Sequence, residues 1–75
     1  MSNSNWKINN HSQKSLMIQE NNNEISIVEP LSNGTFRILA EINTSSNKDN
    51  TKLYDEKLFV STSVDDKELN IFDRS

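Results

Sequence analysis

The 75-residue sequence contains no cysteine and only one proline, one glycine, one histidine and one tryptophan. The absence of cysteine excludes disulfides, thiolate zinc sites and cysteine nucleophiles. A single glycine excludes the glycine-rich loops that approach the phosphates of dinucleotides and nucleoside triphosphates. The one histidine, His11, lies in a polar stretch that offers no fixed position for a general base. We therefore expect no enzymatic activity, no cofactor and no metal site.

The charge balance is mildly acidic, with 11 acidic and 8 basic residues and a formal net charge of −3. Proteins that bind nucleic acids gain most of their affinity from clustered Lys and Arg, so this balance argues against a nucleic-acid partner. No apolar run approaches the roughly 20 residues of a transmembrane helix, and the first residues show no signal-peptide pattern. We expect a cytoplasmic protein that does not contact a membrane.

What the sequence does contain is an alternation of apolar and polar residues around residues that favour turns. The Asn33-Gly34 pair, between two such runs, is typical of β-hairpin turns. Five segments are predicted to be strands on this basis: residues 15–20, 24–29, 35–43, 57–64 and 68–72. Because three of the four connections are short, strands that are neighbours in the sequence are expected to pair antiparallel.

The predicted fold is all-β: a five-stranded antiparallel sheet or meander, with curling into a small barrel as the alternative. Residues 1–14 are predicted to form a polar, flexible N-terminal arm, and residues 15–75 a single small β domain. Residues 44–56 are predicted to be a long loop, with at most one helical turn at 52–55. A chain this short buries about 60% of its unfolded surface, so self-association or a partner is the remaining source of additional stability.

The turn between the second and third predicted strands leaves two registers open. A two-residue loop places Ile27 opposite Ala40, whereas a four-residue loop places Ile27 opposite Ile38. The longer loop is favoured, because the shorter one puts Pro30, which has no N–H, at a hydrogen-bonded position.

The alternation assigns the apolar residues of these strands to two faces. In both registers one face forms the predicted core and carries Ile25, Ile27, Phe36, Ile38, Ala40 and Ile42. The opposite face is expected to be polar, yet it carries Met17, Val28, Leu39, Phe59 and Phe72. Two explanations remain open: the sheet curls over this second face, or the face binds a partner. One β-bulge would exchange some residues between the faces.

Five side chains are predicted to contact a protein partner: Val28, Leu39, Phe59, Tyr54 and Trp6. The first three belong to the second apolar face, and Tyr54 lies in the long loop. Trp6 lies in the N-terminal arm, and Trp is enriched at the centres of protein interfaces. The alternatives for the segment around Trp6 are an additional edge strand and a disordered tail.

These observations predict a non-enzymatic protein-interaction module that inhibits or bridges a protein partner by steric contact, with homo-oligomerisation as an option. Small, acidic, Asn-rich chains without cysteine are common among inhibitors encoded by phages and mobile elements, which is an association by composition only. One alternative is a nucleic-acid-binding small β-barrel, in which aromatic side chains stack on bases. The other is a structural subunit of a larger assembly.

Overall fold

The computed structural model describes residues 5–45 and 51–74, and in these ranges it contains seven strands and no helix. The strands are β1 (Lys7–Asn10), β2 (Met17–Asn21), β3 (Glu24–Pro30), β4 (Phe36–Asn43), β5 (Thr51–Leu53), β6 (Leu58–Ser63) and β7 (Glu68–Asp73). The all-β prediction is confirmed. The predicted number of five strands is wrong, because residues 7–10 and 51–53 also form strands.

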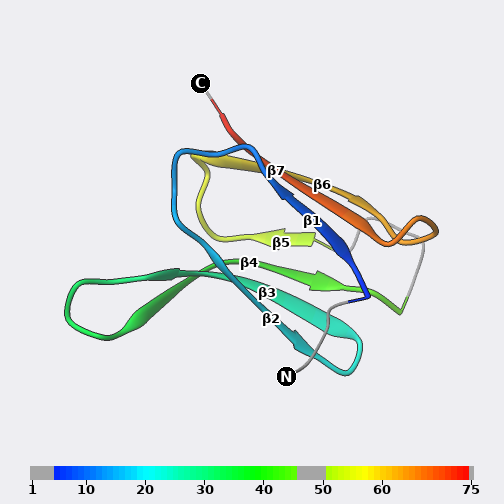
Figure 1. The fold of residues 1–75 in the computed structure, drawn as a ribbon, viewed down its shortest axis with the longest axis horizontal. Helices are drawn as coiled ribbons and strands as arrows, with labels where there is room; N and C mark the ends of the chain where they lie inside the picture. The colour runs from blue at the N-terminus through cyan, green and yellow to red at the C-terminus, as the bar shows by residue number, and fades with distance from the viewer. Residues whose placement is uncertain (1–4, 46–50, 75) are drawn as a thin grey trace.

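The strands form two sheets that face each other, with the orders β1-β7-β6 and β2-β3-β4-β5 (Figure 1). Neighbours in the sequence pair antiparallel in the β2–β3, β3–β4 and β6–β7 hairpins, as the short connections predict. The two sheets do not close into a barrel, so the alternative of a small barrel is wrong.

The first strand, β1, lies in the segment predicted to be a flexible arm. It pairs parallel with β7, with Ile8 beside Leu69, and the pairing continues where the His11 N–H donates to the Ile71 carbonyl at 2.7 Å. Residues 7–10 are therefore part of a sheet. The alternative of an additional edge strand in the segment around Trp6 is confirmed, because β1 lies at the edge of the three-stranded sheet. Its partner, β7, is far away in the sequence and could not be inferred from the alternation of Trp6 and Ile8.

The strand β5 lies in the segment predicted to be a long loop. Thr51, Lys52 and Leu53 pair antiparallel with β4, and the predicted helical turn at 52–55 is absent. Residues 46–50 of that predicted loop lie outside the described residues.

A β-bulge in the β3–β4 hairpin decides which side chains are buried. Ile27 pairs with Ala40, but the next pair is Val28 with Ile38, so Leu39 is an extra residue on β4. Leu39 and Ala40 are both buried on the side of Ile27, while Ile38 is 47% exposed on the other side. Ile27 therefore lies opposite Ala40, as the two-residue loop predicts, and the favoured pairing of Ile27 with Ile38 is wrong. Between the bulge and the turn, the register is shifted by one residue.

The bulge overturns part of the predicted face assignment. Phe36 and Ile38, which were predicted to lie in the core, are exposed. Leu39, predicted to face a partner, is fully buried, and Val28 is 3% exposed. The turn is also longer than predicted, because Pro30 pairs with Phe36 and leaves a loop of residues 31–35.

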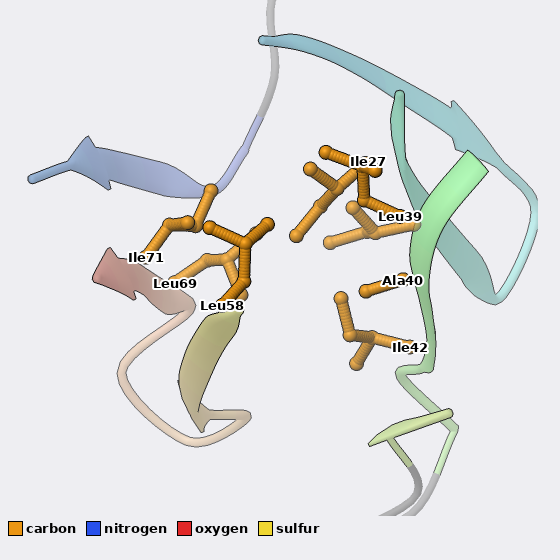
Figure 2. Packing of buried hydrophobic residues seen from close by; sticks show 8 residues of the cluster. Ile27, Leu39, Ala40, Ile42, Leu58, Leu69 and Ile71 are labelled. Atoms are coloured by element: carbon orange, nitrogen blue, oxygen red, sulfur yellow. The ribbon is translucent and has the colours of Figure 1, made fainter. Parts of the chain in front are cut away.

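The core lies between the two sheets. Figure 2 shows Leu58, Leu69 and Ile71 of the three-stranded sheet pointing toward Ile27, Leu39, Ala40 and Ile42 of the four-stranded sheet. Trp6 and Ile8 are half-buried and pack against this cluster. The N-terminal segment therefore contributes apolar contacts to the core as well as a strand.

Candidate protein-interaction surface

The outer face of the four-stranded sheet has a polar half. Cross-strand pairing places Gln19, Ser26, Glu41 and Lys52 in one row across all four strands. The Tyr54 hydroxyl donates to Glu41 Oε1 at 2.6 Å, and the Lys52 ammonium lies 5.3 Å from the centre of the Tyr54 ring. The hydrogen bond to the Glu41 carboxylate raises the pKa of Tyr54, since the ionised phenol would lose it.

The other half of the same face is apolar. Met17, Val28 and Ile38 are direct neighbours across β2, β3 and β4, and the Pro30–Phe36 pair follows toward the turn. Met17 is 43%, Ile38 47% and Phe36 53% exposed, while Val28 is buried between its two neighbours. We call Met17, Val28, Phe36 and Ile38 the apolar patch.

The β3–β4 hairpin extends this patch beyond the body of the protein. In Figure 1 the hairpin projects past the other strands, and residues 30–38 are all exposed. Its turn is held by Asn33 Oδ1, which accepts hydrogen bonds from the Thr35 N–H at 3.2 Å and hydroxyl at 2.6 Å. Gly34 adopts a φ of 82°, which favours glycine, and Leu31 adds an exposed apolar side chain to the tip.

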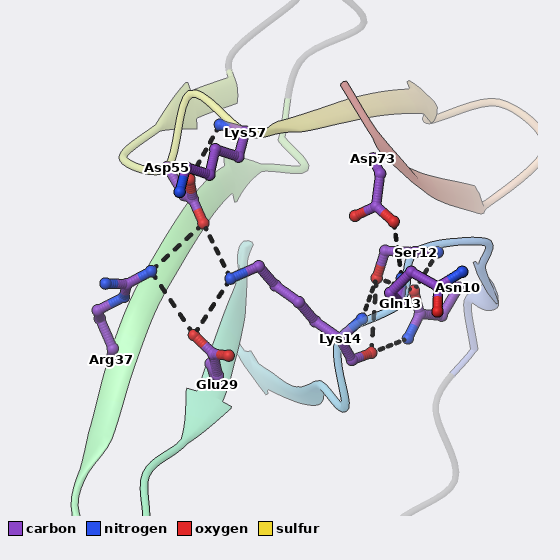
Figure 3. A network of polar contacts seen from close by, with 9 residues as sticks. All are labelled: Asn10, Ser12, Gln13, Lys14, Glu29, Arg37, Asp55, Lys57 and Asp73. Atoms are coloured by element: carbon purple, nitrogen blue, oxygen red, sulfur yellow. Dashed lines mark hydrogen bonds and ion pairs between the residues drawn. The ribbon is translucent and has the colours of Figure 1, made fainter. Parts of the chain in front are cut away.

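Four charged side chains meet where the hairpin leaves the sandwich (Figure 3). Lys14 comes from the β1–β2 connection, Glu29 from β3, Arg37 from β4 and Asp55 from the β5–β6 connection. Each cation lies between the two carboxylates: Lys14 Nζ is 3.6 Å from Glu29 and 3.5 Å from Asp55, and Arg37 is 3.6 and 3.4 Å from the same groups. We call these residues the charge quartet, and it links both inter-sheet connections to the base of the hairpin.

Asp55 is the most buried member of the charge quartet, with a side chain that is 9% exposed. It accepts a hydrogen bond from the Lys57 backbone N–H at 2.9 Å. This bond, together with the nearby Lys14 ammonium and Arg37 guanidinium, lowers the pKa of Asp55 despite the opposing effect of desolvation.

Replacing Asp55 by Asn should remove a contribution to stability that depends on pH. Because the pKa is lower in the folded chain, the unfolded chain binds the proton more tightly, and stability falls as the pH drops below about 3.9 and through the folded pKa. At pH 7 we expect Asp55→Asn to lower the free energy of unfolding by about 1 kcal/mol. In urea denaturation at several pH values, this difference from the wild type should shrink as the pH falls below about 4. Glu56→Gln, at the exposed neighbouring residue, is the control. A stability difference between Asp55→Asn and the wild type that stays constant with pH would contradict the lowered pKa of Asp55.

A pocket of about 630 Å³ opens between the charge quartet and the apolar patch. Its lining combines Ile38, Leu53 and Tyr54 with the charged Arg37 and Asp55. The pocket exists because β5 ends at Leu53 and pairs only with residues 40–42 of β4, which leaves the part of β4 nearer the hairpin turn without a neighbouring strand on that side. The arrangement provides a pocket of mixed character, in which charged side chains lie beside the apolar Ile38 and Leu53.

An aromatic surface lies on the three-stranded sheet. Phe59 and Phe72 are cross-strand neighbours with ring centres 6.2 Å apart, and the His11 ring stacks on Phe72 at 4.7 Å with an interplanar angle of 9°. The Arg74 guanidinium lies 5.9 Å from the centre of the Phe59 ring. We call His11, Phe59 and Phe72 the aromatic row.

The structure separates the five residues predicted to contact a partner. Leu39 is in the core and Val28 is the buried floor of the apolar patch, so neither side chain is accessible as predicted. Tyr54 is 50% exposed beside the pocket, and Phe59 is 48% exposed in the aromatic row, on the other sheet. Trp6 is half-buried against the core cluster and directly precedes β1.

The residues that line the patch were missed for two different reasons. The alternation places Met17 on the second face, but only Val28, Leu39 and Phe59 of that face are among the predicted contact residues. Phe36 and Ile38 were assigned to the core, because alternation without a bulge places them beside Ala40. The shared face of Met17 and Val28 is the sequence signal that points to Met17, whereas no local signal reveals the bulge.

Comparison with protein-family models, with curated proteins and with solved structures finds no match to this chain. Within residues 5–45 and 51–74, no three His, Cys, Asp or Glu side chains are grouped so that they could hold a metal ion. The same residues include no helix with the length and apolar character needed to cross a membrane. Function therefore has to be inferred from the surfaces themselves.

Proposed function

We propose that this chain is a non-enzymatic protein-interaction module that binds a protein partner through the apolar patch and the projecting β3–β4 hairpin. The observation that supports this is the continuous register of Met17, Val28 and Ile38, extended by Phe36 along the hairpin. Single exposed apolar residues are common on protein surfaces, but a contiguous set with a polar border is typical of a binding site.

The pocket beside Ile38 gives such a partner an anchoring position. An apolar side chain of the partner would fill the cavity between Ile38, Leu53 and Tyr54. Arg37, whose side chain is 55% exposed, lies at the rim and offers hydrogen-bond donors. Tyr and Arg are both enriched in the energetically important part of interfaces, so this combination fits a protein partner.

Binding of this kind acts by occupying the partner's surface. A standard interface takes about 800 Å² from each side, which is about a seventh of the 5370 Å² surface of this chain. The apolar patch, the pocket and the hairpin together provide one continuous face for it. The proposed activity is therefore steric inhibition of the partner, or bridging of the partner to another protein.

Photo-crosslinking in a lysate of the source organism tests the proposal. A photoreactive p-benzoylphenylalanine at position 36 should capture a partner, whereas the same residue at position 19, in the polar row, should not. Ile38→Asp should lower the yield at position 36 at least tenfold, because it places a charge in the apolar contact. Circular dichroism establishes that the Ile38→Asp chain is folded. Equal capture at both positions, or a folded Ile38→Asp chain that still binds, would contradict the proposal.

A second candidate function, binding of single-stranded nucleic acid, is supported by the aromatic row. Aromatic side chains on the face of a sheet stack on unpaired bases, and Arg74 beside Phe59 would contact the backbone phosphates. Fluorescence anisotropy with labelled oligonucleotides tests it. Affinity that falls steeply with salt and is lost in Phe59→Ala would support this function over the first.

A further inference from the structure

The edges of the two sheets differ in how they are protected against pairing. Edge strands are commonly kept apart by short length, by charged residues or by bulges. Strand β1 has four residues including Lys7, and β5 has three including Lys52. Strand β2 carries Glu20 opposite the buried Ile25, on the face toward the other sheet. Strand β6 has none of these features: its six residues, Leu58–Ser63, include no charge and no proline, and pair with β7 without a bulge.

The hydrogen-bond pattern shows which groups of β6 face outward. The Arg74 N–H donates to the Lys57 carbonyl at 2.8 Å, so residues 57, 59, 61 and 63 bond to β7. The backbone groups of Val60 and Thr62 consequently point to the open edge. The Leu58 N–H is already bonded to the Asp55 carbonyl. In the described part of the chain, no other strand pairs with this edge.

We propose that two copies of this chain associate through β6, antiparallel about a twofold axis at Ser61, and form a continuous six-stranded sheet. In this register Val60 lies opposite Thr62 of the second copy, and the symmetric pair repeats the contact. The two pairs would form four backbone hydrogen bonds. Ser61 lies opposite Ser61 of the second copy, on the outer face and in a pair that is not hydrogen-bonded.

Charge complementarity identifies a second copy as the occupant of this edge. The uncharged strand pairs with itself without bringing like charges together. The register also brings Lys57, which directly precedes β6, toward the β6–β7 turn of the second copy, which carries Asp65, and the twofold axis repeats this contact. A register shifted by two residues would bring Lys57 next to Ser63 of the second copy and lose both of these opposite-charge contacts. Glu56 and Asp66 lie further out in the turns that flank β6, so they are not paired across the axis.

The proposed dimer is separate from the proposed partner-binding surface. The apolar patch lies on the other sheet, so each copy keeps its patch free. A dimer would present two patches and would bind a multivalent partner with greater avidity. An experiment that contradicts one of the two proposals therefore does not contradict the other.

Charge substitution at Ser61 tests the dimer on the full chain. Sedimentation equilibrium should show wild-type dimers that form in the micromolar range, because strand pairing alone is a small interface. Ser61→Lys and Ser61→Asp should each weaken dimerisation at least tenfold by placing like charges face to face. An equimolar mixture of the two should form heterodimers at least as stable as the wild-type dimer. The matched controls, Gln19→Lys and Gln19→Asp, place the same charges at the middle of the β2 edge and should have no effect.

A cysteine gives a second readout, since the chain has none of its own. The Cα atoms of a non-hydrogen-bonded antiparallel pair lie about 4.5 Å apart, which permits a disulfide. Ser61→Cys should therefore form a disulfide-linked dimer rapidly under mild oxidation, and Gln19→Cys should not. Circular dichroism checks that each variant is folded. A wild-type chain that remains monomeric up to about 1 mM, or dimerisation that responds to Gln19 and not to Ser61, would overturn the proposal.

Discussion

Replacing Leu39 by Ala should lower the free energy of unfolding by about 3 kcal/mol, whereas replacing its neighbour Ile38 by Ala should lower it by less than about 1 kcal/mol. Leu39 is completely buried between the sheets, so the truncation leaves a cavity. Ile38 points to the outer face and is 47% exposed, so its loss removes few contacts. The contrast arises because the bulge puts Leu39, and not Ile38, on the same face of the sheet as the buried Ala40.

Chemical and thermal denaturation of both variants, followed by circular dichroism, measure this contrast. A domain of this size has a total stability of about 4 to 11 kcal/mol, so Leu39→Ala should lower the melting temperature by about 15 °C. The Ile38→Ala variant is the matched control, since it removes a side chain of the same size one position away. A larger loss at Ile38 than at Leu39 would mean that β4 runs without the bulge.

Deleting residues 1–10 should unfold the protein at 25 °C. The deletion removes β1, together with Trp6 and Ile8, which pack against the core cluster. It reduces the three-stranded sheet to the β6–β7 hairpin, and a two-stranded sheet is marginally stable. The loss should exceed the total stability of the folded chain, which is about 4 to 11 kcal/mol for a domain of this size. A dispersed two-dimensional NMR spectrum of the shortened chain would contradict this.

Two single substitutions in β1 separate the apolar contacts from the pairing. Ile8→Ala should lower the free energy of unfolding by about 1–2 kcal/mol, because Ile8 is half-buried against the core. Asn9→Ala should lower it by less than about 1 kcal/mol, although Asn9 donates a hydrogen bond to the Asn70 side chain at 2.9 Å. Equal effects at both positions would show that β1 does not present Ile8 to the core.

The candidate site was predictable only in part. Alternation identified an excess of apolar residues outside the core, and Val28 and Met17 do lie side by side on the outer face. It misplaced Leu39 and Ile38, because a bulge exchanges the faces of the residues beyond it. At that point β4 offers Ile38, Leu39 and Ala40 in succession, and any of them could occupy the core.

The sequence by itself determined the all-β class and the three hairpins, since alternation and turn residues act over about ten neighbouring positions. Only the tertiary structure decided the bulge, because burying both Leu39 and Ala40 depends on the space that Leu58, Leu69 and Ile71 leave across the core. The tertiary structure also decided the position of β1, in which Asn9 donates a hydrogen bond to Asn70, a residue 61 positions away in the sequence. Parallel pairing over that distance needs no turn, so the alternation of Trp6 and Ile8 indicates a strand but not its partner, and the energy of the pairing comes from the assembled core.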